Sequence, residues 1–110
     1  MGITKSNLFD EDVNQIAQLC KAMGHPARIA IIHHLLAQKS CICNDLVTAL
    51  PLSQPTISQH LKALKEAGII QGEVEGGSLC YCINPQALTA IQTYFNHVVN
   101  QVNTIDTLCC

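Results

Sequence analysis

Thiols are the side chains in this sequence best suited to chemistry, because six of its seven cysteines fall in three close pairs. Thiolates bind soft, thiophilic ions, and thiols also join as disulfides under oxidants. The odd number of cysteines argues against a fixed disulfide framework, although any of them can instead fill a core as a small hydrophobe. The cysteines are Cys20, which stands alone, and the pairs Cys41 and Cys43, Cys80 and Cys82, and Cys109 and Cys110.

Length and composition predict one small cytoplasmic domain. The 110 residues are enough for a single core, and with 4% aromatic residues and no Trp that core must be aliphatic. Residues 1–12 lack the apolar run of a secretory signal, and no stretch approaches the roughly 18 apolar residues of a membrane span. We therefore expect no membrane partner and a reducing compartment, in which static disulfides are rare.

Apolar residues recur at steps of four and three from residue 9 to residue 23, which predicts a helix with one buried face. Gly24 ends this helix, and Cys20, inside the stripe, is expected to fill the core. Pro26 suits the first turn of a second helix. The expected buried stripes are Phe9, Val13, Ile16, Cys20 and Met23 in the first helix, and Ile29, Ile32 and Leu36 in the second.

A helix-turn-helix is predicted over residues 44–67. Asn44 can cap its first helix, and Pro51 ends that helix. Ser53 suits the N-cap of the second helix, and Gly68 closes it as a left-handed C-cap. The inward face of this second helix consists of Ile57, Leu61 and Leu64.

Residues 70–83 predict a two-stranded hairpin, which is the wing of a winged helix. Gly76-Gly77 between two alternating runs is typical of a two-residue hairpin loop. If Glu75 pairs with Ser78, the apolar residues share one face of the hairpin. A structural role for the two strand cysteines stays open. The opposite face then holds Gln71, Glu73, Cys80 and Cys82.

The last helix, expected over residues 85–106, carries a heptad stripe that a domain of this size has little core left to cover. Asn84-Pro85 caps and opens it. The stripe can pack on its own domain, but pairing with a second copy is favoured, and the helix at 9–23 can share that interface. The stripe consists of Leu88, Ile91, Phe95, Val98, Val102 and Ile105.

The outer face of the second helix of the helix-turn-helix carries groups that bond base edges or phosphates. The net charge of −2 argues mildly against nucleic acid, but residues 53–65 hold two lysines and no acid. The alternative is that this is an ordinary solvated helix face. The position of the helix in a helix-turn-helix followed by a hairpin favours DNA binding. At about 100° per residue, this face holds Thr56, Gln59, Lys62 and Ala63, with Ser58 and His60 on its flanks.

Three stretches resemble the ArsR/SmtB family of metal- and thiol-responsive bacterial repressors: GHPAR at 24–28, SQPTISQHLKAL at 53–64 and KEAGII at 65–70. The resemblance extends from about Ile16 to Ala87. It implies a mainly α winged helix-turn-helix with a small β-hairpin wing. It also implies a dimer joined through the first and last helices, which covers an operator until an inducer releases it.

The resemblance also implies which residues meet DNA. It implies that the hairpin tip, Gly76-Gly77, lies against the neighbouring DNA backbone or minor groove. Lys62, on the outer face of the helix, is a further expected contact. The implied contacts to the major groove are Ser53, Gln54, Thr56, Ser58, Gln59 and His60.

Cys41-Ile42-Cys43 resembles the Cys-x-Cys at the start of the third helix in arsenic-, cadmium- and lead-responsive members. A helix N-terminus lowers the pKa of a thiol and favours the thiolate. Arsenic-responsive members often carry a third cysteine shortly afterwards, and residues 44–47 lack it. In winged helices the segment before the third helix often lies beside the second hairpin strand. We therefore expect a third thiolate from Cys80 or Cys82, or from Cys109-Cys110.

The zinc site of other members needs paired acidic and histidine positions on the last helix. This chain offers only His97 and Asp106 there, so a zinc site is not expected at that place.

The sequence thus predicts a homodimeric repressor that leaves operator DNA when arsenite, cadmium or lead binds its cysteine thiolates. No cofactor is expected for DNA binding, and no protein partner is implied beyond a second copy. An enzyme is not expected, because no Cys-x-x-Cys in a βαβ setting, phosphate loop or activated nucleophile is found. The open alternatives are a repressor switched by oxidant or reactive sulfur through a disulfide, and a dimeric adaptor without DNA affinity.

Overall fold

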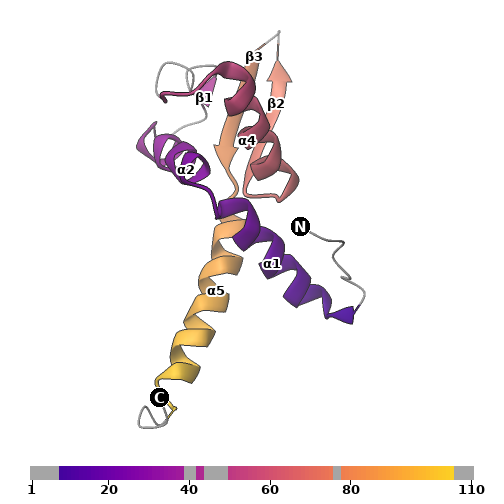
Figure 1. The fold of residues 1–110 in the computed structure, drawn as a ribbon, viewed down its shortest axis with the longest axis vertical. Helices are drawn as coiled ribbons and strands as arrows, with labels where there is room; N and C mark the ends of the chain where they lie inside the picture. Colours follow the sequence, from indigo (N-terminus) through magenta and orange to yellow (C-terminus); the bar gives the residue numbers. More distant parts are fainter. Residues whose placement is uncertain (1–7, 39–41, 44–49, 76–77, 106–110) are drawn as a thin grey trace.

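The computed structural model describes residues 8–38, 42–43, 50–75 and 78–105, and for 38, 42–43, 73–75 and 78–80 it describes the backbone alone. Helices α2 and α4 and a small sheet form one body, and α1 and α5 project from it (Figure 1). The elements in chain order are α1 (Glu11–Met23), α2 (Pro26–Gln38), β1 (Ile42–Cys43), α4 (Gln54–Glu66), β2 (Ile70–Glu75), β3 (Ser78–Ile83) and α5 (Pro85–Val102).

The three strands form an antiparallel sheet in the order β1-β3-β2. Glu75 pairs with Ser78 at the end of the hairpin, which confirms the register predicted from the two intervening glycines. β1 adds a short third strand on the other side of β3, where Ile42 pairs with Tyr81. The wing is therefore tied to the segment that precedes α4.

The core lies where α2, α4 and the base of the hairpin meet. Ile57, Leu61 and Leu64 of α4 are all buried, as their spacing predicted. Ile69 and Ile70 continue this cluster into the start of β2. Burial of these aliphatic side chains is the main stabilising term for such a fold. It also turns the opposite side of α4 outward.

The predicted core faces of α1 and α2 are partly wrong. Cys20 is exposed, not buried. The same correction applies to Phe9, Val13 and Leu36, which are 61%, 53% and 55% exposed. Both helices carry apolar residues on more than one side, so periodicity alone did not decide which side packs. The buried residues of these helices are Leu19 and Ala22 in α1, and Ile31, Ile32 and Leu35 in α2.

Two predicted caps are confirmed. Gly68 has a φ of 83°, a left-handed conformation that glycine adopts without strain, and it follows the end of α4. The side chain of Asn84 accepts a hydrogen bond from the backbone N–H of Gln86, so it caps α5. α5 ends at Val102, and Ile105 of the predicted stripe therefore lies beyond the helix.

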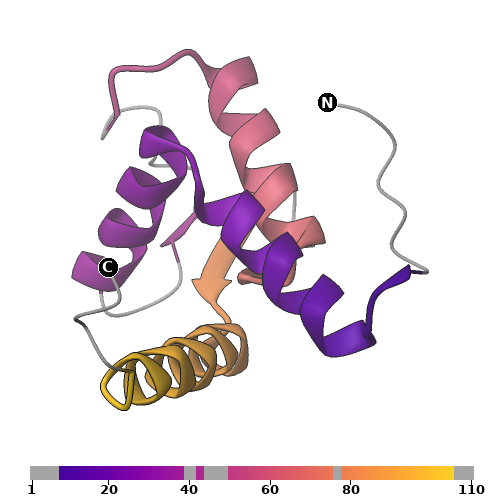
Figure 2. The same ribbon diagram turned by 60° about the horizontal axis from the view of Figure 1, so that its bottom comes forward.

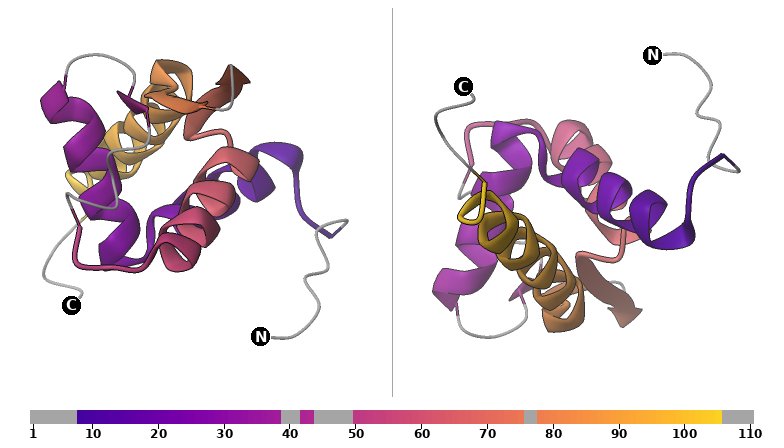
Figure 3. Two further views of the ribbon diagram at one scale, coloured as in Figure 1. Left: turned by 90° about the horizontal axis from the view of Figure 1, so that it is seen from above. Right: turned by 90° about the horizontal axis from the view of Figure 1, so that it is seen from below.

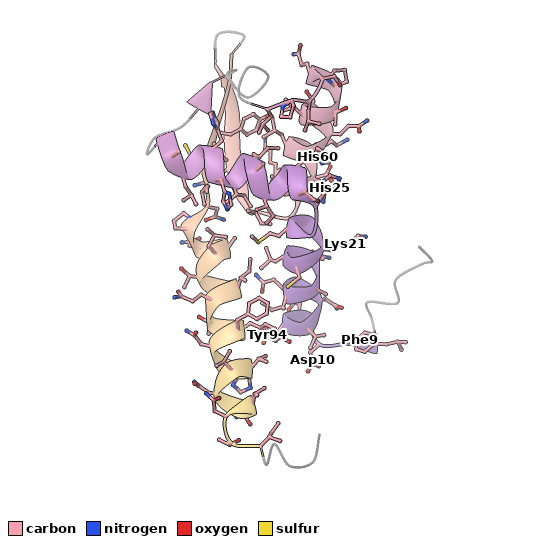
Figure 4. All side chains as sticks on the ribbon, turned by 60° about the vertical axis from the view of Figure 1, so that its left-hand side comes forward. Phe9, Asp10, Lys21, His25, His60 and Tyr94 are labelled. Atoms are coloured by element: carbon pink, nitrogen blue, oxygen red, sulfur yellow. The ribbon has the colours of Figure 1, made fainter. Side chains whose placement is uncertain are left out.

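α1 lies between α4 and α5 and contacts both (Figure 2). In Figure 1, α5 extends away from α2 and α4 along most of its length, and the view from below in Figure 3 brings its far end forward. No helix within the described ranges is long and apolar enough to cross a membrane. Tyr94 of α5 points toward α1 (Figure 4). The inner surfaces of α1 and α5 thus form a short two-helix layer below the winged-helix body.

Candidate nucleic-acid interface and thiol site

The outer face of α4 carries most of the predicted DNA contacts in accessible positions. Because the inward face packs on the core, the polar groups on the other side meet solvent. Thr56 and His60 are half-buried at the edges of this face. The exposed predicted contacts are Ser53, Gln54, Ser58, Gln59 and Lys62.

Ser53 occupies the N-cap position of α4 with an extended backbone. Its side chain makes no capping hydrogen bond to the helix backbone. Instead, its hydroxyl lies 3.0 Å from the hydroxyl of Thr56. The two hydroxyls therefore hold each other at the start of α4, where backbone N–H groups remain open to a phosphate.

The positive charge on α4 comes from Lys62 and Lys65. Lys62 Nζ lies 4.0 Å from Glu66 Oε1, and both side chains are largely exposed. Such an exposed pair contributes only about 0.3–0.5 kcal/mol, so Lys62 can exchange this partner for a phosphate. The local charge of the face is compatible with DNA despite the acidic chain.

His60 is held from outside α4. Arg28 of α2 donates from Nε to His60 Nδ1 at 3.2 Å, and it donates from Nη1 to the backbone oxygen of Ala22 at 3.2 Å. The rings of His25 and His60 lie 4.4 Å apart and tilted by 49°. Burial lowers the pKa of His60 below its usual 6.5, and the charges of His25 and Arg28 lower it further.

Three of the cysteines predicted for the thiol site, Cys43, Cys80 and Cys82, lie in the sheet. Cys43 of β1 lies opposite Cys80 of β3, so the segment after α2 does run beside the second hairpin strand as expected. Across the hairpin, Cys82 pairs with Gln71 and Cys80 with Glu73, which confirms the predicted polar face. Directly opposed residues share one face of a sheet.

Cys82 is disulfide-bonded. Cys20 is free and exposed. No group of three metal-binding side chains occurs among those that the structure describes.

Several predicted site residues lie outside the described residues, as does the first helix of the helix-turn-helix up to residue 49. These residues are Cys41, Gly76, Gly77, Cys109 and Cys110.

The winged-helix geometry agrees with comparisons against known proteins. The model of the bacterial regulatory protein, arsR family, matches residues 25–71. The HTH-type transcriptional regulator YgaV of Escherichia coli K12 is 32% identical over 89 residues, which cover 81% of this chain and 90% of that protein. This chain belongs to the ArsR family. The matched residues include α2, β1 and α4, and therefore the whole outer face of α4.

Other relatives of this ArsR-family chain are also named as regulators. The HTH-type transcriptional repressor SmtB of Mycobacterium tuberculosis is 41% identical over 71 residues, which cover 64% of this chain and 52% of that protein. The chain therefore spans about half the length of that relative. The arsenical resistance operon repressor of Staphylococcus xylosus is 28% identical over 95 residues, 86% of each protein. None of these names describes an enzyme.

A solved structure supports the fold of the ArsR-family chain. The crystal structure of an ArsR family transcriptional regulator superposes with a TM-score of 0.76 at 17% identity, and it covers 86% of this chain and 96% of that one. At this identity the likeness establishes the fold alone.

Sequence reasoning did not find the role of Arg28. It lies in the stretch at 24–28 that carries the family resemblance, but nothing in its spacing indicates a bond to a residue 32 positions later. Only the packing of α2 against α4 brings the two side chains together.

Proposed function

We propose that this chain is a DNA-binding transcriptional repressor that binds its operator as a homodimer. The observation that carries the proposal is the exposed polar face of α4, which lies inside the ArsR-family match and is backed by buried Ile57, Leu61 and Leu64. A helix of this kind inserts into the major groove and presents amide, hydroxyl and lysine groups to base edges and phosphates. The hairpin then lies beside the DNA backbone next to this groove.

A second copy is the proposed partner of α1 and α5. A groove of about 500 Å³ between these helices is mostly apolar and includes Val13, Cys20 and Phe95. Val13 is 53% exposed and Phe95 49% exposed in the single chain. Apolar side chains in one continuous stripe are typical of a buried interface. A two-fold dimer also suits a helix-turn-helix, which meets two half-sites about 34 Å apart.

The proposed inducer is arsenite or a soft divalent metal such as cadmium or lead. Cysteine thiolates are the ligands that such ions prefer, and the register that sets Cys43 opposite Cys80 supports a site between β1 and β3. Cys82 lies two residues along the same strand and can add a third sulfur once its disulfide is reduced. Cys41 is the other primary ligand beside Cys43, and Cys109 and Cys110 are further candidates for the third sulfur.

The expected effect of the inducer follows from where these cysteines lie. Cys43 precedes the segment that leads into α4, whereas Cys80 and Cys82 belong to the wing. An ion held by both pulls the two DNA-contacting elements toward one fixed arrangement. A changed tilt of α4 alters the spacing between the two helices of a dimer, and a coupling of this kind changes affinity by about 5- to 150-fold.

A disulfide switch is the second candidate, and the bonded state of Cys82 favours it. Two thiols lose two protons and two electrons in this step, and hydrogen peroxide accepts them to become two waters. The new disulfide restrains the position of the wing, as an ion bound by the same cysteines would.

The test is an operator-binding titration with reduced protein. Fluorescence anisotropy of a labelled duplex from the promoter of its own operon measures affinity at a stated salt concentration. Release by arsenite, Cd²⁺ or Pb²⁺ supports the metal mechanism, whereas release by peroxide alone supports the disulfide switch. A protein that is monomeric at micromolar concentration and binds no DNA at low salt contradicts the whole proposal.

A further inference from the structure

Arg28 connects three helices through one side chain. It belongs to α2, its Nη1 group donates to the carbonyl of Ala22 in the last turn of α1, and its Nε group donates to His60 in α4. The carbonyls at the end of a helix lack partners within that helix, so Arg28 satisfies one of them. The same guanidinium thus joins the helix that contacts α5 to the helix that carries the polar outer face.

Both histidines of this cluster act as hydrogen-bond acceptors. His60 Nδ1 accepts from Arg28, and His25 Nδ1 accepts from the backbone N–H of Ala27 at 3.0 Å, at the start of α2. An imidazole nitrogen accepts a hydrogen bond only when it carries no proton. The bond from Arg28 therefore requires the His60 ring to be neutral. Figure 4 shows His25 and His60 together at the corner where α1 and α2 meet.

We propose that Arg28 and His60 are a positioning pair that sets the orientation of α4 against α1, and that operator binding needs His60 in its neutral form. The inference rests on the proposed DNA-binding function. It assigns His60 a role in holding α4, the proposed recognition helix, in addition to any contact of His60 with DNA. Acidification then weakens operator binding through this pair.

Protonation of His60 disrupts the pair in two ways. Nδ1 becomes a donor that faces the donor Nε of Arg28, and a second positive charge then lies beside the guanidinium. The groups that act on His60 are His25 before α2 and Arg28 of α2. Among other charged residues of the described part, Lys21 of α1 and Glu66 of α4 line a pocket with Arg28, and Lys62 pairs with Glu66.

The direction of the pH effect follows from the lowered pKa of His60. The unfolded chain binds a proton on this ring near pH 6.5, whereas the folded chain binds it only at lower pH. The bond from Arg28 is therefore present above pH 6.5 and is lost as the pH falls through the lowered pKa. A lower pH otherwise makes the net charge of a protein more positive, which strengthens its nonspecific binding to DNA. A loss of affinity in acid thus opposes the nonspecific trend.

The test is the pH profile of operator affinity between pH 7.5 and 5.0. We expect the wild-type affinity to fall by about tenfold or more, which is the range for losing a hydrogen bond to a charged group. His60→Gln keeps a hydrogen-bond acceptor that does not titrate. The operator affinity of this variant should therefore not fall between pH 7.5 and 5.0. The matched control is His33→Gln, an exposed histidine of α2, which should keep the wild-type profile. An unchanged fall in His60→Gln overturns the proposal.

A double-mutant cycle separates positioning from direct contact with DNA. If Arg28 acts through His60, the losses from Arg28→Met and His60→Ala should not add in the double variant. Additive losses overturn the pairing. Circular dichroism checks that each variant folds, and Arg28→Lys serves as the milder change. Lysine keeps the positive charge but lacks the two separate nitrogens that bond His60 and Ala22, so Arg28→Lys should bind with intermediate affinity.

An NMR titration of the His60 ring tests the pair without DNA. The pKa of His60 should lie below 6.5 in the wild type and rise in Arg28→Met, which removes a neighbouring positive charge. An unchanged pKa in Arg28→Met overturns the pair. Absence of operator binding at pH 7.5, with the expected NMR result, instead identifies a failure of the proposed function.

Discussion

Cys43 of β1 lies directly opposite Cys80 of β3, so one antiparallel pair joins the segment before α4 to the wing. The two cysteines come from either side of the recognition helix in the sequence. A ligand or bond that spans this pair acts on both elements proposed to meet DNA. A change at these two cysteines can therefore alter how the proposed DNA-contacting elements are arranged.

Replacing Cys43 or Cys80 by Ser should abolish release from the operator by arsenite or cadmium, because a serine hydroxyl is a poor ligand for soft ions. The measurement is anisotropy of labelled operator during titration with each ion. Cys20→Ser is the matched control, since Cys20 is exposed on α1 and is not part of the sheet. Wild-type release in both Cys43→Ser and Cys80→Ser would exclude this pair as the sensor.

Phe95→Glu should separate the proposed dimer, because it introduces a charge into the apolar stripe of α5. We expect the dimer dissociation constant to rise by about thirtyfold or more, as for a central interface residue. Sedimentation over a range of protein concentrations measures this change. Asn96→Glu adds the same charge at the next position, where the residue is exposed and polar. Equal effects of the two substitutions would show that α5 is not the interface.

Gln59→Ala and Lys62→Ala should weaken operator binding in different ways. Loss of a base contact by Gln59 costs about 1–3 kcal/mol and relaxes sequence preference. Loss of a phosphate contact by Lys62 weakens all sequences alike and reduces the salt slope by about one. Glu66→Ala should strengthen binding, since it removes the acid 4.0 Å from Lys62.

The control for these substitutions is Gln101→Ala in the last turns of α5, where the side chain is exposed. Affinity is measured on the operator and on a scrambled duplex at several salt concentrations. If Gln59→Ala and Gln101→Ala bind both duplexes equally well, the outer face of α4 does not contact bases.

Leu64→Ala should lower the free energy of unfolding by about 2–5 kcal/mol, because it leaves a cavity in the core. Leu64 is 0% exposed, whereas Leu36 is 55% exposed. Leu36→Ala is therefore expected to change stability by no more than about 0.5 kcal/mol. Urea unfolding at one fixed protein concentration compares them, since dimerisation couples to stability. Equal losses would mean that Leu36 is buried in the native assembly.

Local sequence patterns determined the recognition helix and the wing. The spacing of Ile57, Leu61 and Leu64 predicted which side of α4 is buried, because an aliphatic stripe at helical spacing has one face to bury. Two glycines between alternating runs predicted the pairing of Glu75 with Ser78, because a two-residue loop leaves only one register. Each of these features depends on residues close together in the chain.

Only the tertiary structure decided the features that join distant parts of the chain. The faces of α1 and α2 were mispredicted at Cys20 and Leu36, because these helices have apolar residues on several sides and the neighbouring elements select one. Nothing local relates Arg28 to His60, since their bond forms only when α2 packs on α4. Periodicity specifies which residues of an element can be buried, but the partner surface is set by the fold as a whole.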